Sequence, residues 1–280
     1  FLWIKRRISP EQMQAVHDIG EPGLLFGPRE MRIYPNGDLA AHILGGSGFG
    51  NEGVSSAEVI GVAGVEKAFD AWLRDPANEG APLALSIDVT VQQAMEDVLS
   101  SGMRLMNAKG ATGILMEVKS GEILAMASLP DFDPNDRPRP LLTGDPSDSP
   151  LFNRAVQGQY ELGSTFKIFP VAQALDLGLI NPASGINAQA PMRIGRFLIN
   201  DFHNYGRELS ATDVIVKSSN VATVRIAQMI GVDRQKDFLE KLGLFVPTPI
   251  EMVEAPTGQP LVPQRWPAVT SATVSFGHGL

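Results

Sequence analysis

Two short runs of β-forming residues, 113–118 and 123–128, are separated by only four residues, and this spacing constrains the fold more than any other feature. The connecting residues have Ser120 and Gly121 at their centre, a pair that suits a tight turn between two strands. The sequence therefore predicts a β-hairpin and, with it, an antiparallel sheet.

Helical patterns lie on both sides of this hairpin. Before it, Thr90 and Gln93 form a capping-box pattern, and apolar residues then repeat at helical spacing for roughly four turns. After it, we expect helices at 210–216 and 221–230, and we expect a short strand at 84–87, ahead of the first helix. The order helix, hairpin, helices predicts an α+β fold in which helices pack on the antiparallel sheet.

The composition changes once along the chain, at residues 74–82, where Pro, Gly and Asn separate two periodic segments. A chain of 280 residues is longer than one core usually needs, so we predict a smaller domain at 1–80 and a larger one at 81–280. The chain begins with Phe1 rather than Met and reaches Leu280 without a stop signal, so we expect a piece of a longer polypeptide, truncated at both ends.

Composition also excludes several classes of function. The net charge is −8 and the longest basic run is Lys5 to Arg7, which argues against a protein that follows nucleic-acid phosphates. The absence of cysteine excludes disulfides and thiolate catalysis, and the four histidines are too scattered to predict a metal site. No apolar run approaches the ~18 residues of a membrane span.

Residues 130–150, which hold six prolines, are expected to form a long irregular loop.

One hydroxyl and one amine lie three residues apart at Ser164 and Lys167, directly after Gly163 and at the start of an apolar run. A helix that begins there places both groups on one face, with the hydroxyl at the positive end of the helix dipole. Apolar neighbours favour partial burial of the amine, which lowers its pKa, and a neutral lysine can take the proton of a serine hydroxyl. Backbone N–H groups of the same turn can hold the oxyanion that forms when the serine attacks a carbonyl.

The alternative interpretation of this segment is a helix cap with a surface lysine, since Ser-x-x-Lys occurs by chance in many chains. Pro170 falls inside the predicted helix and is expected to distort it. Further along, Ser218 and Asn220 lie two residues apart between two predicted helices, where a turn could aim both side chains into one cleft. The alternative is that one of them caps the second helix.

Two other features suggest chemistry less strongly. Gly48, Gly50 and Gly53 match a dinucleotide-binding G-x-G-x-x-G, but no strand–helix context surrounds them, and a flexible loop is the alternative interpretation. His203 is a candidate general base, against which we set a hydrogen-bonded structural histidine next to a substrate cleft.

Ser-x-x-Lys and Ser-x-Asn, in this order, match two of the three motifs shared by class A β-lactamases and penicillin-binding proteins, the third being Lys-Thr-Gly. The segments 163–167 (GSTFK) and 217–222 (KSSNVA) resemble the class B penicillin-binding proteins, the monofunctional DD-transpeptidases. The resemblance covers nearly the whole chain and includes the segments 34–37, 40–45, 64–70, 153–156 and 274–277. Among subtypes, the chain most resembles the septal, division-specific transpeptidase of Gram-negative bacteria.

The chain departs from the family pattern in three places. Ser219 stands where the signature has Asp, and Leu162 stands where the family usually has proline. The Lys-Thr-Gly motif is absent, and the nearest tripeptide is Pro-Thr-Gly at 256–258. The resemblance implies that this motif is missing through truncation or disorder, and that the segment alone is poorly active or inactive.

The resemblance implies a penicillin-binding/β-lactamase-like transpeptidase domain at 81–280, without its Lys-Thr-Gly portion, and part of a non-catalytic pedestal domain at 1–80. The implied substrates are peptidoglycan stem peptides ending in D-Ala-D-Ala. An amine of a neighbouring stem would resolve the acyl-enzyme and form a cross-link. β-Lactams would acylate the same serine, and no metal or organic cofactor would be needed.

Four residues take roles through the resemblance. Ser164 would attack the penultimate D-alanine carbonyl, and Lys167 would accept the serine proton. Ser218 would relay a proton towards the leaving D-alanine. Asn220 would bind the backbone of the donor peptide and steady Lys167.

The implied setting is the inner membrane, with a single N-terminal anchor absent from this chain and the catalytic domain in the periplasm. The implied partners are a SEDS-type glycan polymerase and other division proteins. The alternatives are a β-lactam sensor, a catalytically silent division scaffold, a D-Ala-D-Ala carboxypeptidase or a β-lactamase. A class A β-lactamase would carry a Glu-x-x-Leu-Asn element to activate water, and the sequence has none.

Overall fold

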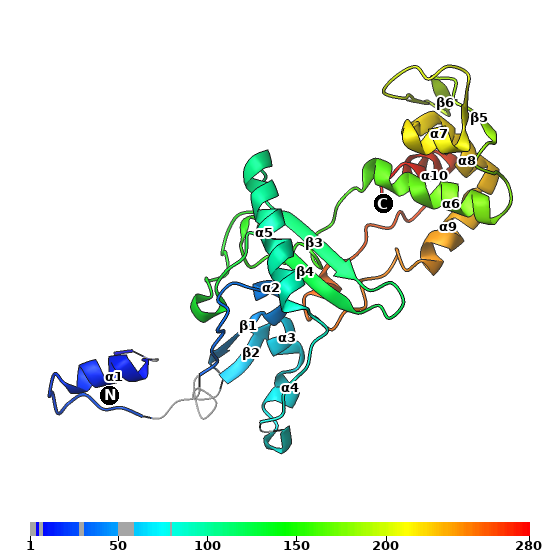
Figure 1. The fold of residues 1–280 in the computed structure, drawn as a ribbon. Helices are drawn as coiled ribbons and strands as arrows, with labels where there is room; N and C mark the ends of the chain where they lie inside the picture. The colour runs from blue at the N-terminus through cyan, green and yellow to red at the C-terminus, as the bar shows by residue number, and fades with distance from the viewer. Residues whose placement is uncertain (1–3, 6–7, 28–30, 50–58, 79) are drawn as a thin grey trace. The chain divides into compact units, whose positions relative to one another are not determined.

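The computed structural model describes residues 4–5, 8–27, 31–49, 59–78 and 80–280 (Figure 1). Helices and antiparallel strand pairs are both present, as the sequence predicts for an α+β fold. Among the described helices, none is both long enough and apolar enough to cross a bilayer.

The chain divides into two compact units, which we call the N-terminal unit and the C-terminal unit. The N-terminal unit comprises 1–156 and 250–254, and the C-terminal unit comprises 157–249 and 255–280. The predicted boundary near residue 80 is of a different kind, because it separates a pedestal from a catalytic domain by role and not by compactness. It stays a prediction.

The N-terminal unit combines short helices with two strand pairs. In chain order its elements are α1 (Pro10–His17), α2 (Ala41–Leu44), β1 (Gly46–Phe49), β2 (Val59–Ala63), α3 (Gly64–Ala68), α4 (Asp70–Leu73), α5 (Val89–Met106), β3 (Ala111–Met116) and β4 (Ile123–Leu129). β1 pairs with β2 and β3 pairs with β4, both antiparallel. The proline-rich residues 130–150 hold two 3₁₀ turns, at Pro134–Asp136 and Pro146–Asp148, and are otherwise irregular, as predicted.

The predicted hairpin is confirmed as β3 and β4. Ala111 lies opposite Leu129, and the strands run antiparallel from there to the turn. The Glu117 N–H donates to the Glu122 carbonyl at 2.9 Å, and Gly121 takes a left-handed conformation with φ of +79°. A glycine is needed at that point because a side chain would make this conformation costly.

Two local predictions ahead of the hairpin are wrong. The cap of α5 is Asp88, whose carboxylate accepts from the N–H groups of Thr90 and Val91 at 2.9 and 3.0 Å, so Thr90 is inside the helix rather than at its start. Residues 84–87 form no strand, because the backbone bond to β4 in this region is a single one, from the Asp88 N–H to the Leu124 carbonyl, and one bond makes no ladder.

A buried glutamine attaches α5 to the hairpin. The Gln92 side chain is fully buried, accepts from the Met126 N–H at 2.8 Å and donates to the Met126 carbonyl at 2.9 Å. It also donates to Glu96 at 2.7 Å, and Glu96 accepts from the Ala40 N–H at 2.9 Å. This amide therefore satisfies both backbone groups of a buried strand residue, and through Glu96 the network reaches the segment that precedes α2.

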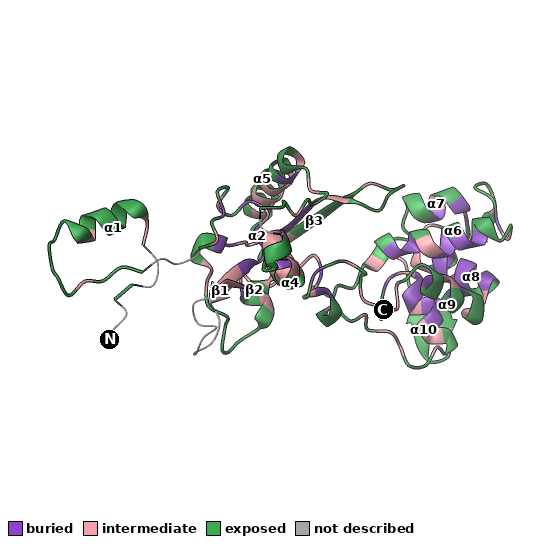
Figure 2. Cartoon of the chain, turned by 90° about the horizontal axis from the view of Figure 1, so that it is seen from below, coloured by how far each residue is buried: buried purple, intermediate pink, exposed green. Residues whose placement is uncertain are grey.

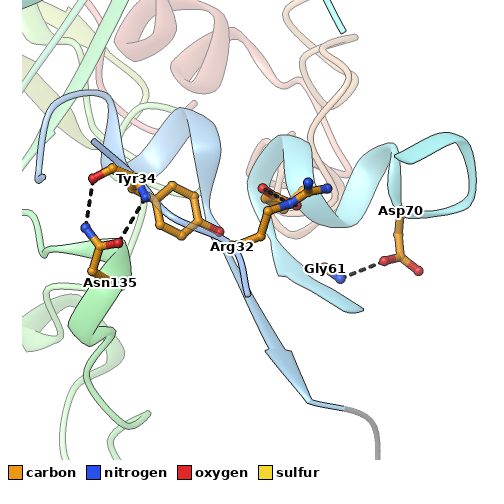
Figure 3. Close-up of polar contacts among 6 residues, drawn as sticks. Arg32, Tyr34, Gly61, Asp70 and Asn135 are labelled. Atoms are coloured by element: carbon orange, nitrogen blue, oxygen red, sulfur yellow. Dashed lines mark hydrogen bonds and ion pairs between the residues drawn. The ribbon is translucent and has the colours of Figure 1, made fainter. Parts of the chain in front are cut away.

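Further polar contacts tie the first segments of the chain to the rest of the N-terminal unit (Figure 3). The Asn135 side chain accepts from the Tyr34 N–H at 3.0 Å and donates to the Tyr34 carbonyl at 2.8 Å, although the two residues are far apart in sequence. Asp70 accepts from the Gly61 N–H at 2.7 Å. The first pair of bonds fixes irregular backbone at Tyr34 that no ladder holds, and the last bond satisfies a backbone N–H of β2.

The C-terminal unit is mainly helical. Its elements are a 3₁₀ turn (Gly163–Lys167), α6 (Ile168–Asp176), β5 (Gly185–Asn187), β6 (Met192–Ile194), β7 (Phe197–Ile199), β8 (Glu208–Ser210), α7 (Ala211–Val216), α8 (Asn220–Ile230), α9 (Val232–Lys241) and α10 (Ala268–Ser275). The predicted helices at 210–216 and 221–230 are confirmed as α7 and α8. β5 pairs with β8, and β6 pairs with β7, both antiparallel.

Helix α8 is largely buried in this unit, and much of it is purple in Figure 2. Most of its residues are buried, namely Val221, Ala222, Thr223, Val224, Ile226, Ala227 and Ile230. A helix that is apolar on nearly all sides must be covered on nearly all sides, and α6, α9 and α10 pack against it. Because α8 starts at Asn220 and α6 follows Lys167, this packing brings the two predicted motifs towards each other.

The Gln92 network makes a prediction about stability. We expect Gln92→Leu to lower the free energy of unfolding by about 2–3 kcal/mol, because the N–H and carbonyl of Met126 lose their partners while they stay buried. Urea unfolding followed by circular dichroism measures the loss. Gln93→Ala is the matched control, since Gln93 is the exposed neighbour on the same helix and should change stability by less than about 0.5 kcal/mol. Equal losses in the two variants would contradict the role given to the buried amide.

Candidate active site

Ser164 lies in the 3₁₀ turn that leads directly into α6. The sequence predicts a distortion of the helix near Pro170. In the structure, the backbone has 3₁₀ geometry up to Lys167 and α-helical geometry from Ile168. Since α6 begins at Ile168, Pro170 lies in its first turn, where a missing N–H costs least. Ser164 is exposed, whereas Lys167, one turn further on, is only 1% exposed.

The Lys167 amine contacts three oxygens. Its Nζ lies 3.1 Å from Ser164 Oγ, 2.9 Å from Ser218 Oγ and 2.6 Å from the Ser218 carbonyl oxygen. One nitrogen therefore brings together three of the four residues that the sequence predicts for the site, although Lys167 and Ser218 are 51 residues apart in the chain.

Burial changes the acid–base behaviour of this amine. Loss of contact with water lowers the pKa of Lys167 from 10.5 to about 8, and the nearby carboxylate of Asp201 opposes the shift by favouring the ammonium. At pH 7 about one such amine in ten is neutral, compared with fewer than about one in a thousand for an ordinary lysine. Lys167 is therefore able to accept a proton at physiological pH.

Ser218 owes its position to an unusual backbone conformation. Its φ is +54°, in the left-handed region, directly after the end of α7. The Ser218 N–H donates to the Ile215 carbonyl at 3.1 Å and the Ser219 N–H to the Val214 carbonyl at 3.0 Å. The chain therefore turns sharply between α7 and α8, so that the carbonyl and hydroxyl of Ser218 face Lys167 while Ser219 enters the core.

A carboxylate that the sequence analysis missed holds this turn. Asp201 accepts from the Ser219 hydroxyl at 2.7 Å and from the Val221 N–H at 3.0 Å. Ser219 is fully buried, and its hydroxyl also accepts from the Ala222 N–H at 3.0 Å as the cap of α8. The only hint in the sequence is an aspartate just after a short apolar run, because its partners lie about 20 residues downstream.

Asn220 lies at the start of α8, two residues after Ser218, and its side chain donates to the Asn200 carbonyl at 3.1 Å. In the part of the chain that the structure describes, Asn220 makes no hydrogen bond to Lys167. The physical reason is that an ammonium has three N–H donors, and two oxygens of Ser218 and one of Ser164 already take them.

The other sequence candidates lie outside this arrangement. His203 is exposed and makes edge-to-face contacts with Phe202 and Tyr205, with no hydrogen bond to any described residue, so the predicted hydrogen-bonded histidine is wrong. Gly48 lies in β1, but Gly50 and Gly53 are outside the described residues. Within the described part of the chain, no group of three or more His, Asp or Glu side chains is arranged to hold a metal ion.

Comparison with protein families matches both parts of the chain. The model of the penicillin binding protein transpeptidase domain matches residues 111–280, and the model of the penicillin-binding protein dimerisation domain matches residues 2–79. The first match covers more than half of the chain and contains all four predicted site residues.

Curated relatives agree with these matches. The chain is 39% identical to the probable peptidoglycan D,D-transpeptidase FtsI of Caulobacter vibrioides over 274 residues, which are 98% of this chain and 44% of that protein. It is 30% identical to the peptidoglycan D,D-transpeptidase FtsI of Escherichia coli over 302 aligned positions, covering all of this chain and 49% of that protein. The chain thus spans about half the length of the curated relatives it matches.

Solved structures show the same fold. Penicillin binding protein 3 from Mycobacterium tuberculosis is similar with a TM-score of 0.74 and 28% sequence identity, over 89% of this chain and 55% of that one. That protein has also been solved in complex with aztreonam and with ampicillin. The family matches, the relatives and the fold together show that this chain belongs to the penicillin-binding protein transpeptidase family.

Proposed function

We propose that this chain carries the nucleophile of a peptidoglycan D,D-transpeptidase, which cross-links stem peptides through an acyl-enzyme at Ser164. The observation that carries the proposal is the buried Lys167 amine, 3.1 Å from the hydroxyl of Ser164 and 2.9 Å from that of Ser218. The names of the relatives and the matching transpeptidase domain support the same reaction.

The first half of the reaction forms the acyl-enzyme. Ser164 Oγ attacks the carbonyl carbon of the penultimate D-alanine, and its proton passes to the neutral amine of Lys167. The carbonyl oxygen becomes an oxyanion, which a backbone N–H of the 3₁₀ turn after Gly163 can stabilise. The exposed position of Ser164 beside a buried base suits this step, because the substrate reaches the hydroxyl while water does not reach the amine.

The second half releases one product and forms the other. When the tetrahedral intermediate collapses, the bond to the terminal D-alanine breaks, and its nitrogen takes a proton that Lys167 supplies through the Ser218 hydroxyl. An amine of a neighbouring stem then attacks the ester carbon, and Ser164 recovers its proton. Asn220 binds the backbone of the donor peptide, and the bond from its amide to the Asn200 carbonyl supports this role by orienting the side chain.

The same chemistry extends to inhibitors and to a cellular role. A β-lactam ring presents a strained amide to Ser164, so we propose that β-lactams acylate it, and the complexes of penicillin binding protein 3 with aztreonam and ampicillin support this. The similarity to FtsI proteins supports a role in septal wall synthesis. With it we propose a SEDS-type glycan polymerase and other division proteins as partners, and an inner-membrane anchor that holds the catalytic domain in the periplasm.

Covalent labelling tests the proposed nucleophile and base. We expect a fluorescent penicillin to label the protein as its gene encodes it, Ser164→Ala to take up no label, and Lys167→Ala to label at least about 10²-fold more slowly, because the proton acceptor is gone. Labelling is followed by gel fluorescence over time. Lys217→Ala is the matched control, since Lys217 is an exposed lysine directly before Ser218 and pairs with Asp213 instead of the catalytic serines. A labelled Ser164→Ala variant would contradict the assignment.

The fate of the label separates the remaining alternatives. Slow release, together with cross-linking of a stem peptide to an added amine, is the result expected of a transpeptidase. Release within seconds would indicate a β-lactamase or a carboxypeptidase, and slow release without cross-linking would indicate a sensor.

Acylation should depend on pH through Lys167. The neutral amine is the active form, so we expect the acylation rate constant to rise about tenfold per pH unit at low pH and to level off above about 8. The sign follows from the base role, since protonation below this pKa removes the acceptor. Rate constants of labelling measured between about pH 6 and 10 test this, and a flat profile would contradict it.

Substitution of the neighbouring serines Ser218 and Ser219 should have different effects, one on the acylation rate and the other on stability. Ser218→Ala is expected to slow acylation about 10²-fold with little effect on unfolding, because the residue is exposed and its hydroxyl contacts Lys167. Ser219→Ala should instead lower the free energy of unfolding by about 1–2 kcal/mol, since it removes a helix cap and a partner of Asp201. Labelling rates and urea unfolding of both variants check this, and the reverse pattern would contradict it.

A further inference from the structure

The residues that follow α10 lie directly against the turn that carries Ser164. The Gly163 N–H donates to the Gly277 carbonyl at 3.0 Å. A Cβ atom placed on Gly277 would lie 2.0 Å from the Gly163 carbonyl oxygen, so no side chain fits between the two segments. Both glycines have positive φ, +58° and +80°, which other residues adopt at a cost. The backbone just before the nucleophile is therefore in direct contact with a distant part of the chain.

Glu161 makes a second connection between the same two segments. One carboxylate oxygen accepts from the Gly279 N–H at 3.2 Å, and the other lies 3.1 Å from Nδ1 of His278. Glu161 precedes Gly163 by two residues, and Gly279 follows Gly277 by two, so the two contacts lie side by side. Together they hold the segment 161–163 at two points rather than one.

The segment that Glu161 holds is itself anchored in the core. The Gly277 N–H donates to the Val274 carbonyl at 2.9 Å, and the His278 N–H donates to the Thr273 carbonyl at 3.1 Å. Val274 is fully buried in a cluster with Phe166 and Leu239, against which Leu280 also packs. Phe166 lies between Ser164 and Lys167, so residues 277–280 are fixed to the same cluster that supports the catalytic pair.

We propose that Glu161 is a positioning residue for the acylation of Ser164, an inference that rests on the proposed function. Its carboxylate does not reach the reacting atoms. It fixes the approach to the 3₁₀ turn, so that Ser164 Oγ stays at hydrogen-bond distance from Lys167 Nζ. A displacement of about 1 Å in such a pair can cost about 10²-fold in rate.

The bond to the Gly279 N–H is the important one of the two contacts. The pair with His278 is exposed on both sides, 58% for the Glu161 side chain and 64% for His278, and exposed pairs contribute little. The bond to the backbone instead limits where the chain can lie. A neutral side chain that accepts from the same N–H should therefore replace the carboxylate.

The test compares four variants of the protein as its gene encodes it: Glu161→Ala, Glu161→Gln, His278→Ala and Glu240→Ala. The measured quantity is the rate constant for labelling by a fluorescent penicillin. It is normalised to the fraction of protein that is labelled at the end of the reaction, so that unfolded protein does not lower it. Glu240 is an exposed glutamate of the same unit, on α9, and its variant is the matched control. Thermal unfolding of each variant is recorded in parallel.

We expect Glu161→Ala to acylate about 10-fold or more slowly per site. Glu161→Gln, His278→Ala and Glu240→Ala should stay within about threefold of the unsubstituted protein. A purely structural role of Glu161 would lower the melting temperature but leave the rate per site unchanged. Glu161→Asp, whose carboxylate is one methylene shorter, serves if the alanine variant does not fold, and should acylate at an intermediate rate.

Two results would overturn the proposal while leaving the proposed function intact. One is that the unsubstituted protein takes up label and the Glu161→Ala variant labels just as fast per site. The other is a Glu161→Gln variant as slow as Glu161→Ala, which would mean that charge and not the backbone bond matters. An unsubstituted protein that takes up no label would instead refute the proposed function, and the positioning role with it.

Discussion

The buried amine of Lys167 is the contact on which the rest of the site depends. Removing an amine from water is costly, and three oxygens from two distant segments compensate for the lost hydration. Those segments meet because α6 and α8 pack against each other, and α8 buries apolar side chains worth about 1.5–3 kcal/mol each. The apolar core of the C-terminal unit therefore stabilises the arrangement that lowers the pKa of the lysine.

Much of the fold and of the site could be predicted from sequence because the signals are local. The spacing of the β3–β4 hairpin, the helical periodicity and the three-residue step from Ser164 to Lys167 are all carried by a few neighbouring residues. The cap of α5 was missed because the contact that favours it is not local. Asp88 and Thr90 are both good caps, and the choice is made by a backbone bond between Asp88 and the distant residue Leu124.

The residues that sequence reasoning missed act over long distances along the chain. Asp201 binds groups about 20 residues away, and Glu161 binds Gly279 at a separation of 118 residues. Neither contact has a periodicity or a spacing rule that could reveal it. In the same way, sequence alone could not show that oxygens of Ser164 and Ser218 already take the three donors of the Lys167 amine.

The contact between Ser219 and Asp201 has a consequence for how these two positions can vary among related chains. With an aspartate at 219, as in the Ser-Asp-Asn form of the motif, two carboxylates would face each other at hydrogen-bond distance, and one would have to bind a proton. The identities of the two residues are therefore coupled. A homologue with aspartate at position 219 should carry an uncharged residue at position 201. The residue at one of these positions therefore predicts the residue at the other.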